Sequence, residues 1–194
     1  MLAVMSEPHR PDTAAGSLLV ITGPPGAGKS TVARLIADRL PSSVLVEGDA
    51  FFAFLASGAI EPWLPESHGQ NHVVTAAAAA ATATFVDGGY ATVYDGVLGP
   101  WFLPHFIASS GLRSFDYALL LPPAEDCVRR VVDRVGHGFD DEAATRHMHE
   151  QFTAADLDDR HVFVNPTGDA EATAQAVLAA SSAGELRLGS DGVH

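Results

Sequence analysis

One stretch decides the fold of this chain: residues 23–30, with the sequence Gly23-Pro24-Pro25-Gly26-Ala27-Gly28-Lys29-Ser30. It matches the pattern G-x-x-x-x-G-K-[ST] at every fixed position. An apolar run, Leu18–Ile21, precedes it, and apolar residues follow at helical spacing, namely Val32, Leu35, Ile36 and Leu40. The stretch therefore joins a predicted strand to a predicted helix, which is the setting in which this motif binds phosphate.

Short apolar runs continue along the chain at Val44–Val46, Ala91–Tyr94, Tyr117–Leu121 and Val162–Val164. Helix-compatible stretches separate them, including an alanine-rich segment from about residue 72 to residue 87 that two glycines close. Strand and helix thus alternate about five times, which is typical of a parallel sheet covered on both faces. We predict an α/β fold, a doubly wound five-stranded parallel sheet.

The length of 194 residues fits one domain. We expect it to span residues 17–183, because residues 1–16 and 184–194 are rich in Pro, Gly, Ser and Asp and lack apolar periodicity. These two ends are expected to be disordered tails. The sequence leaves open whether the protein is a monomer or a homodimer.

The composition excludes several classes of partner. There are 24 acidic residues against 11 basic ones, so the formal net charge is −13, and such a surface repels nucleic acid and anionic membranes. No run of the length needed to cross a bilayer is apolar throughout. The single cysteine, Cys127, and a start without the apolar core of a signal peptide favour a cytoplasmic location. A small-molecule partner is expected instead.

The glycine-rich stretch predicts a nucleotide site. Its backbone N–H groups and the positive end of the following helix form a cradle for phosphates. Lys29, the only lysine in the chain, is expected to reach the β and γ phosphates, and the Ser30 hydroxyl to bind Mg²⁺. The cofactors are therefore ATP and Mg²⁺, with GTP left open as donor, and the binding residues are Gly23, Pro24, Pro25, Gly26, Ala27, Gly28, Lys29, Ser30 and Thr31.

Two aspartates follow predicted strands, and ligands bind at the carboxyl ends of strands in open α/β sheets. Asp95 closes the third apolar run as a Mg²⁺-binding carboxylate does, and it lies near the substrate as well. Asp49 closes the second run and is predicted to face an acceptor hydroxyl. Either aspartate has an alternative role as a helix cap.

These motifs resemble a known family. GPPGAGKST, the aspartate in VEGDAFF and the Asp-Gly in VYDGVLGPW are similar to the small P-loop kinases of the nucleoside-monophosphate kinase type. The pattern is nearest to the branch of chloramphenicol phosphotransferase, gluconate kinase and zeta toxin. The resemblance covers about residues 17–180 and implies that Asp49 is the base on the acceptor hydroxyl and that Asp95 lies near the metal. The acceptor glycines of shikimate kinase and the histidine of gluconate kinase are absent.

The resemblance also implies a lid over about residues 134–146 and an adenine pocket that includes Thr167 and Gly168. Apolar residues Val128, Val131, Val132 and Val135 predict one helix stripe, which puts Arg130 and Arg134 on the opposite face. We expect these two arginines to contact the transferred phosphoryl group, and Arg134 also the nucleotide. Arg146 is a weaker candidate.

The acceptor side is predicted to be aromatic and without basic residues. Neither arginine nor lysine occurs between residues 40 and 112, which argues against anionic acceptors. Phe51, Phe52 and Trp101 are expected to contact a neutral or cationic substrate, such as an antibiotic or a nucleoside. The sequence thus predicts a small-molecule kinase. A nucleotide-dependent ATPase or switch and a nucleoside-monophosphate kinase are the alternatives.

Overall fold

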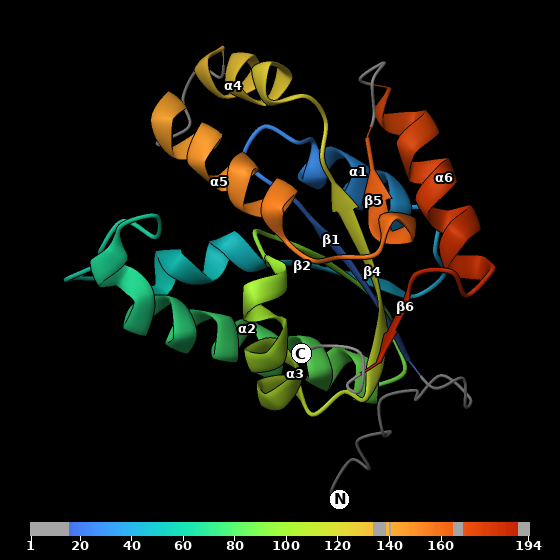
Figure 1. Ribbon diagram of the computed structural model, residues 1–194. Helices are drawn as coiled ribbons and strands as arrows, with labels where there is room; N and C mark the ends of the chain where they lie inside the picture. The colour runs from blue at the N-terminus through green and yellow to red at the C-terminus, as the bar shows by residue number, and fades with distance from the viewer. Residues whose placement is uncertain (1–15, 134–138, 140, 165–168, 190–194) are drawn as a thin grey trace, which may run out of the picture.

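A parallel sheet forms the centre of the computed structural model, which describes residues 16–133, 139, 141–164 and 169–189 (Figure 1). Five parallel strands lie in the order β2-β3-β1-β4-β5. Their bounds are β1 Ser17–Thr22, β2 Ser43–Glu47, β3 Ala91–Asp95, β4 Ser114–Leu120 and β5 Val162–Phe163. The predicted doubly wound five-stranded parallel sheet is confirmed.

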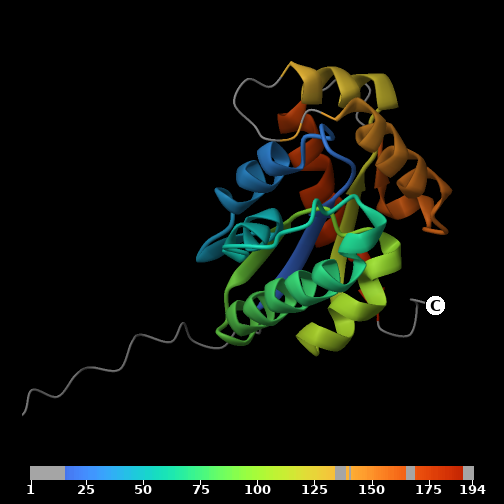
Figure 2. The ribbon, with the colours of Figure 1, turned by 90° about the vertical axis from the view of Figure 1, so that its left-hand side faces the viewer.

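Helices cover both faces of this sheet, as the two views in Figures 1 and 2 show. One face packs against α1 (Lys29–Ala37) and α6 (Ala170–Ser182), and the other against α2 (His68–Asp87) and α3 (Leu103–Ser110). In Figure 1, α4 (Ala124–Val132) and α5 (Glu142–Ala154) lie together beyond the carboxyl end of β4. These two helices therefore stand over the edge of the sheet where the phosphate loop begins.

Alternating side chains of β1 divide the interior into two cores. Leu18 and Val20 belong to the core beneath α2 and α3, whereas Leu19 and Ile21 belong to the core beneath α1 and α6. A strand buried on both faces has this continuous apolar sequence because successive side chains point to opposite sides. β1 is thus held rigidly in the middle of the sheet, and it positions the loop that follows it.

A sixth strand, β6 (Arg187–Gly189), pairs antiparallel with β4. Its Leu188 is buried, as is Leu186 just before it. The expectation of a disordered tail from residue 184 is therefore wrong for residues 184–189. A three-residue strand carries too little periodicity to be recognised in a sequence rich in Gly and Ser. The expected tail at residues 1–15 lies outside the described residues.

Two helices differ from their predicted forms. α2 begins at His68, four residues before the alanine-rich signal. The sequence did not indicate this start, because the first turn of α2 is polar and carries no apolar period. In α4, Val128 and Val131 are buried as predicted, but Val132 is 55% exposed. The predicted apolar stripe is therefore wrong at Val132, and Val135 lies outside the described residues.

No helix of the described ranges is long and apolar enough to span a bilayer.

Candidate active site

The phosphate loop between β1 and α1 takes a conformation that its glycines permit. Gly23, Gly26 and Gly28 have φ angles of 145°, 76° and 93°, which side-chain-bearing residues rarely adopt. A Cβ atom at Gly26 would also lie 2.2 Å from the carbonyl oxygen of Cys127 in α4. The loop is therefore both curled and packed tightly against α4, and α1 begins directly after it, at Lys29.

Lys29 is held at the mouth of this loop. Its side chain is only 8% exposed, and its Nζ donates a hydrogen bond to the carbonyl oxygen of Pro24 at 3.1 Å. A buried ammonium needs such acceptors, because burial without a partner is costly. The lysine side chain thus folds back over the phosphate loop, where it would meet a bound phosphate chain.

Arg130 connects the lid side of the site to the phosphate loop. Its Nη1 donates to the carbonyl oxygen of Gly26 at 3.1 Å. The structure therefore brings one of the predicted arginines into contact with the phosphate loop. Arg134, Thr167 and Gly168 lie outside the described residues, and so does most of the predicted lid. Arg146 instead forms two ion pairs: one with Glu125 at 2.6 Å, which joins α5 to α4, and one with Glu142 at 3.0 Å within α5.

Asp95 lies buried at the end of β3, and among the described residues its Oδ1 has no hydrogen-bond partner. Burial raises the pKa of this carboxyl above its ordinary value, while the Ser30 hydroxyl and the Lys29 ammonium act in the opposite direction. A carboxylate and a hydroxyl are the hard oxygen donors that Mg²⁺ prefers. The pair Asp95 and Ser30 therefore fits the predicted metal, although no cluster of three His, Cys, Asp or Glu residues occurs within the described ranges.

Asp49 occupies a different position, in the short 3-10 helix η1 (Gly48–Phe54) that follows β2. Its side chain is exposed and lines a cavity, and its Oδ1 makes only a long contact of 3.5 Å with the backbone N–H of Val97. The carboxylate is therefore available to a ligand. The two predicted aspartates are not equivalent, because one opens to the cavity and the other is sealed beneath the loop.

The cavity has a volume of about 520 Å³ and extends from the phosphate loop to α2 and α5. That volume is in the range of small-molecule sites. Aromatic rings form much of its wall, among them Phe52, Trp63, Trp101 and Phe102. The described lining contains one lysine, Lys29, on the nucleotide side and no arginine. The acceptor end is thus apolar with one carboxylate, Asp49.

Two of the residues predicted to contact substrate do not line this cavity. Phe51 packs against the core and makes an edge contact with Phe54 at 5.5 Å between ring centroids. Asp95 is absent from the lining. Both predictions are corrected. Phe51, in the first turn of η1, packs inward against the core. Asp95 is buried, so only its predicted role near the metal is kept. Phe52, Asp49 and Trp101 line the cavity as predicted.

Several cavity residues were missed by the sequence reasoning. α2 contributes Asn71, Val74, Thr75 and Ala78, so the alanine-rich helix forms one wall and is more than a packing element. Tyr94 from β3 also lines the cavity. α5 adds a polar edge with His147 and Gln151. The signal for α2 is its small side chains, which leave room beside them; the other residues carry no recognisable motif.

Tyr94 is buried beneath the two aspartates, with 5% of its side chain exposed. Burial is the main cause that raises the pKa of its phenol, and the charges of Asp49 and Asp95 raise it further. The phenol therefore keeps its proton throughout the physiological range. It is a hydrogen-bond donor located next to both carboxylates.

Comparisons with known proteins agree with this geometry. A family model described as "AAA domain" matches residues 18–155 of the chain. A search of curated proteins found no match. The matched range includes all of β1 except Ser17, the phosphate loop, both aspartates and helices α1 to α5.

Solved structures share the fold at low sequence identity. The tunicamycin resistance protein of Deinococcus radiodurans is 16% identical with a TM-score of 0.63, over 87% of this chain and 96% of that one. The APS kinase of Mycobacterium tuberculosis, solved with AMPPNP and APS, is 18% identical with a TM-score of 0.64, over 88% and 99%. A gluconokinase of Sinorhizobium meliloti 1021 is 21% identical with a TM-score of 0.61, over 88% and 95%. These likenesses show the P-loop kinase fold.

Proposed function

This chain belongs to the AAA domain family, whose model matches residues 18–155, and from that premise we propose that it is an ATP-dependent small-molecule kinase. It transfers the γ-phosphoryl group of ATP to a hydroxyl of a neutral or cationic acceptor. The single observation that carries the proposal is the cavity, which joins Lys29 and Ser30 of the phosphate loop to Asp49 and an aromatic wall. A site for nucleotide alone has no need of that second compartment.

The proposed reaction uses the residues on either side of the cavity. The acceptor oxygen forms a bond to the γ-phosphorus while the bond from that phosphorus to the β–γ bridging oxygen breaks, and ADP leaves with the electron pair. Asp49 accepts the proton of the acceptor hydroxyl and later releases it to water. Lys29 compensates the negative charge of the phosphates. Ser30 and Asp95 would hold Mg²⁺, which supplies further charge compensation when it is bound.

The acceptor class follows from charge and shape. The described cavity lining offers no arginine or lysine beyond Lys29, so an anionic acceptor has no counter-charge at the acceptor end. Asp49 favours a neutral or cationic compound there. Phe52, Trp63 and Trp101 provide flat apolar surface for an aromatic or apolar portion. An antibiotic, a nucleoside or a related metabolite fits these features better than a sugar acid.

A screen tests this proposal. The full chain is incubated with ATP, Mg²⁺ and a panel of nucleosides, aromatic diols, amino alcohols and sugar acids, and the products are examined by mass spectrometry for the gain of one phosphate. We expect gain only among neutral or cationic compounds. Efficient phosphorylation of gluconate, shikimate or a nucleoside monophosphate contradicts the acceptor class, and hydrolysis of ATP without any phosphorylated compound supports an ATPase or switch.

A further inference from the structure

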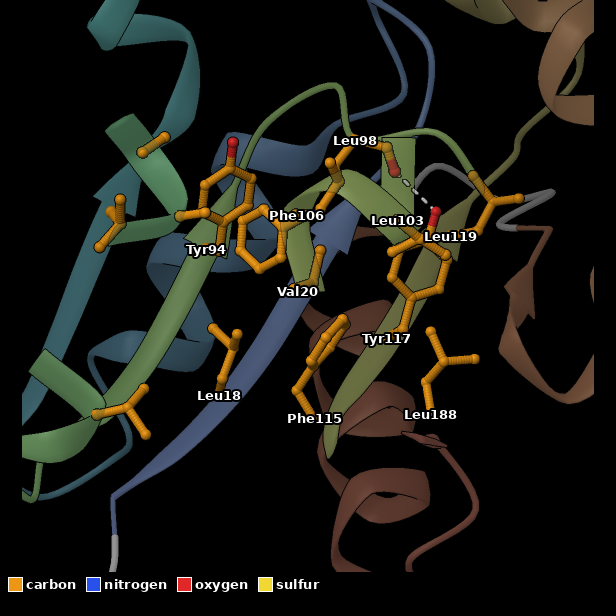
Figure 3. Close-up of a cluster of buried hydrophobic side chains, with 14 of the residues drawn as sticks. Leu18, Val20, Tyr94, Leu98, Leu103, Phe106, Phe115, Tyr117, Leu119 and Leu188 are labelled. Atoms are coloured by element: carbon orange, nitrogen blue, oxygen red, sulfur yellow. Dashed lines mark hydrogen bonds between the residues drawn. The ribbon is translucent and has the colours of Figure 1, made fainter. Parts of the chain in front are cut away.

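Two buried tyrosines lie at the same height in the sheet. Val20 of β1 pairs in register with Tyr94 of β3 on one side and with Tyr117 of β4 on the other. Both rings belong to the core beneath α2 and α3. Figure 3 shows their phenol oxygens pointing toward the same end of the sheet. Tyr94 and Tyr117 therefore form a matched pair of buried tyrosines, and each can serve as the control for the other.

The two phenols differ in their partners. Tyr117 Oη donates to the carbonyl oxygen of Leu98 at 2.8 Å, the contact drawn as a dashed line in Figure 3. Tyr94 Oη makes no hydrogen bond to any residue of the described ranges; the residue is 5% exposed, against 0% for Tyr117, and it lines the cavity. Buried tyrosine hydroxyls usually find a partner. The partner of Tyr94 is therefore to be sought in the cavity.

Two glycines leave the space that this phenol occupies. A Cβ atom at Gly48 would lie 2.2 Å from Tyr94 Oη, and one at Gly96 would lie 3.0 Å from its Cε1 atom. Neither glycine has a positive φ angle, so backbone conformation does not require them. Gly48 directly precedes Asp49, and Gly96 directly follows Asp95. The phenol is thus set between the two carboxylate-bearing strand ends.

We propose that Tyr94 positions the acceptor, with its phenol donating a hydrogen bond to an acceptor oxygen that neighbours the hydroxyl held by Asp49. This inference rests on the proposed function and narrows its substrate class. The acceptor carries a second oxygen, as a hydroxyl, ether or carbonyl group, near the hydroxyl that is phosphorylated. A phenol is a donor at neutral pH, so it complements such an oxygen where Asp49 does not.

The test compares Tyr94→Phe with Tyr117→Phe in the full chain, using the compounds of the panel that the parent protein phosphorylates. Tyr94→Phe should lower kcat/KM about 10-fold, mainly through KM, because one neutral hydrogen bond to the acceptor is lost. Tyr117→Phe should change kcat/KM less than about 2-fold, because Leu98 keeps a second donor in the Thr22 hydroxyl at 3.1 Å. Compounds that lack the second oxygen should be phosphorylated equally by the parent and Tyr94→Phe.

Equal kcat/KM of Tyr94→Phe and the parent on every phosphorylated compound overturns the inference and leaves the proposed function intact. If the parent phosphorylates nothing, the proposed function fails, and a binding measurement decides the inference separately. The chain has three tyrosines, so 3-fluorotyrosine labelling gives three ¹⁹F resonances that Tyr→Phe variants assign. A shift of the Tyr94 resonance when panel compounds are added, with Tyr117 unmoved, keeps the phenol as a ligand contact. No shift of Tyr94 with any compound overturns it.

Discussion

Arg130 Nη1 donates a hydrogen bond to the carbonyl oxygen of Gly26, at 3.1 Å and across 104 positions of sequence. The contact ties α4 to the phosphate loop and keeps a guanidinium beside the place where phosphates would bind. Arg130→Ala should therefore lower turnover of ATP about 10- to 100-fold, the range for a lost hydrogen bond from a charged donor. Arg129→Ala is the matched control, because its neighbouring guanidinium is exposed and pairs with Asp126. If Arg130→Ala and Arg129→Ala had equal activity, the contact of Arg130 with Gly26 would serve only to stabilise the fold.

Lys29→Ala should reduce phosphoryl transfer by about 10²- to 10³-fold, since it removes the charge closest to the transferred group. Ser30→Ala should also lose most transfer, but high Mg²⁺ should restore part of it. Initial rates across a Mg²⁺ titration separate the two effects. Near-normal turnover in both variants contradicts the assignment of the phosphate loop.

Asp95→Asn should make the metal-free protein more stable, by about 1 kcal/mol. Burial raises the pKa of this carboxyl in the folded state, so ionisation of Asp95 opposes folding, and stability falls as the pH rises through the folded pKa. Mg²⁺ with ATP should stabilise the parent more than the variant, because the variant lacks a metal ligand. Thermal unfolding with and without Mg²⁺ measures both effects. A variant that is less stable than the parent without metal speaks against this account of Asp95.

The burial of His161 predicts that the folded state loses stability as the pH falls. Its side chain is 1% exposed, and burial is the main cause that lowers its pKa, with the Arg160 charge adding to the effect. The folded state therefore takes up a proton less readily than the unfolded state. Stability contributed by the neutral imidazole is complete above a pH of about 6.5 and is lost as the pH falls toward the folded pKa. His161→Gln should flatten the fall in melting temperature on acidification, whereas exposed His147→Gln should leave the slope as in the parent.

The sequence predicted the sheet well because each strand of a parallel sheet is a dense apolar run, and the phosphate loop because two glycines, a lysine and a serine stand at fixed spacing. It also predicted a functional carboxylate at Asp49, and this side chain lines the cavity. The sequence did not show that Phe51 packs inward while Phe52 lines the cavity, because adjacent residues of a short 3-10 helix carry no period that separates the two faces.

Tyr94 shows a second limit. In the sequence it is one more apolar residue of a strand, and the room for its phenol is left by Gly48, which lies 46 positions earlier. The position of Arg130 could not be predicted for the same reason, because its partner Gly26 is distant in sequence. Contacts of this kind depend on strand order and helix placement, which local patterns do not specify.

The most direct measurement of the central claim is the fate of the γ-phosphate in the parent and in Asp49→Asn, with ADP, inorganic phosphate and phosphorylated compound all quantified. For the parent we predict equal amounts of ADP and phosphorylated compound. Asp49→Asn should form the compound about 10²- to 10⁴-fold more slowly, with ATP affinity unchanged and no rescue by Mg²⁺. Glu47→Gln, whose carboxylate pairs with Arg34 at the end of β2, should behave as the parent. ADP matched only by inorganic phosphate, at the same rate in the parent and in Asp49→Asn, would contradict the account.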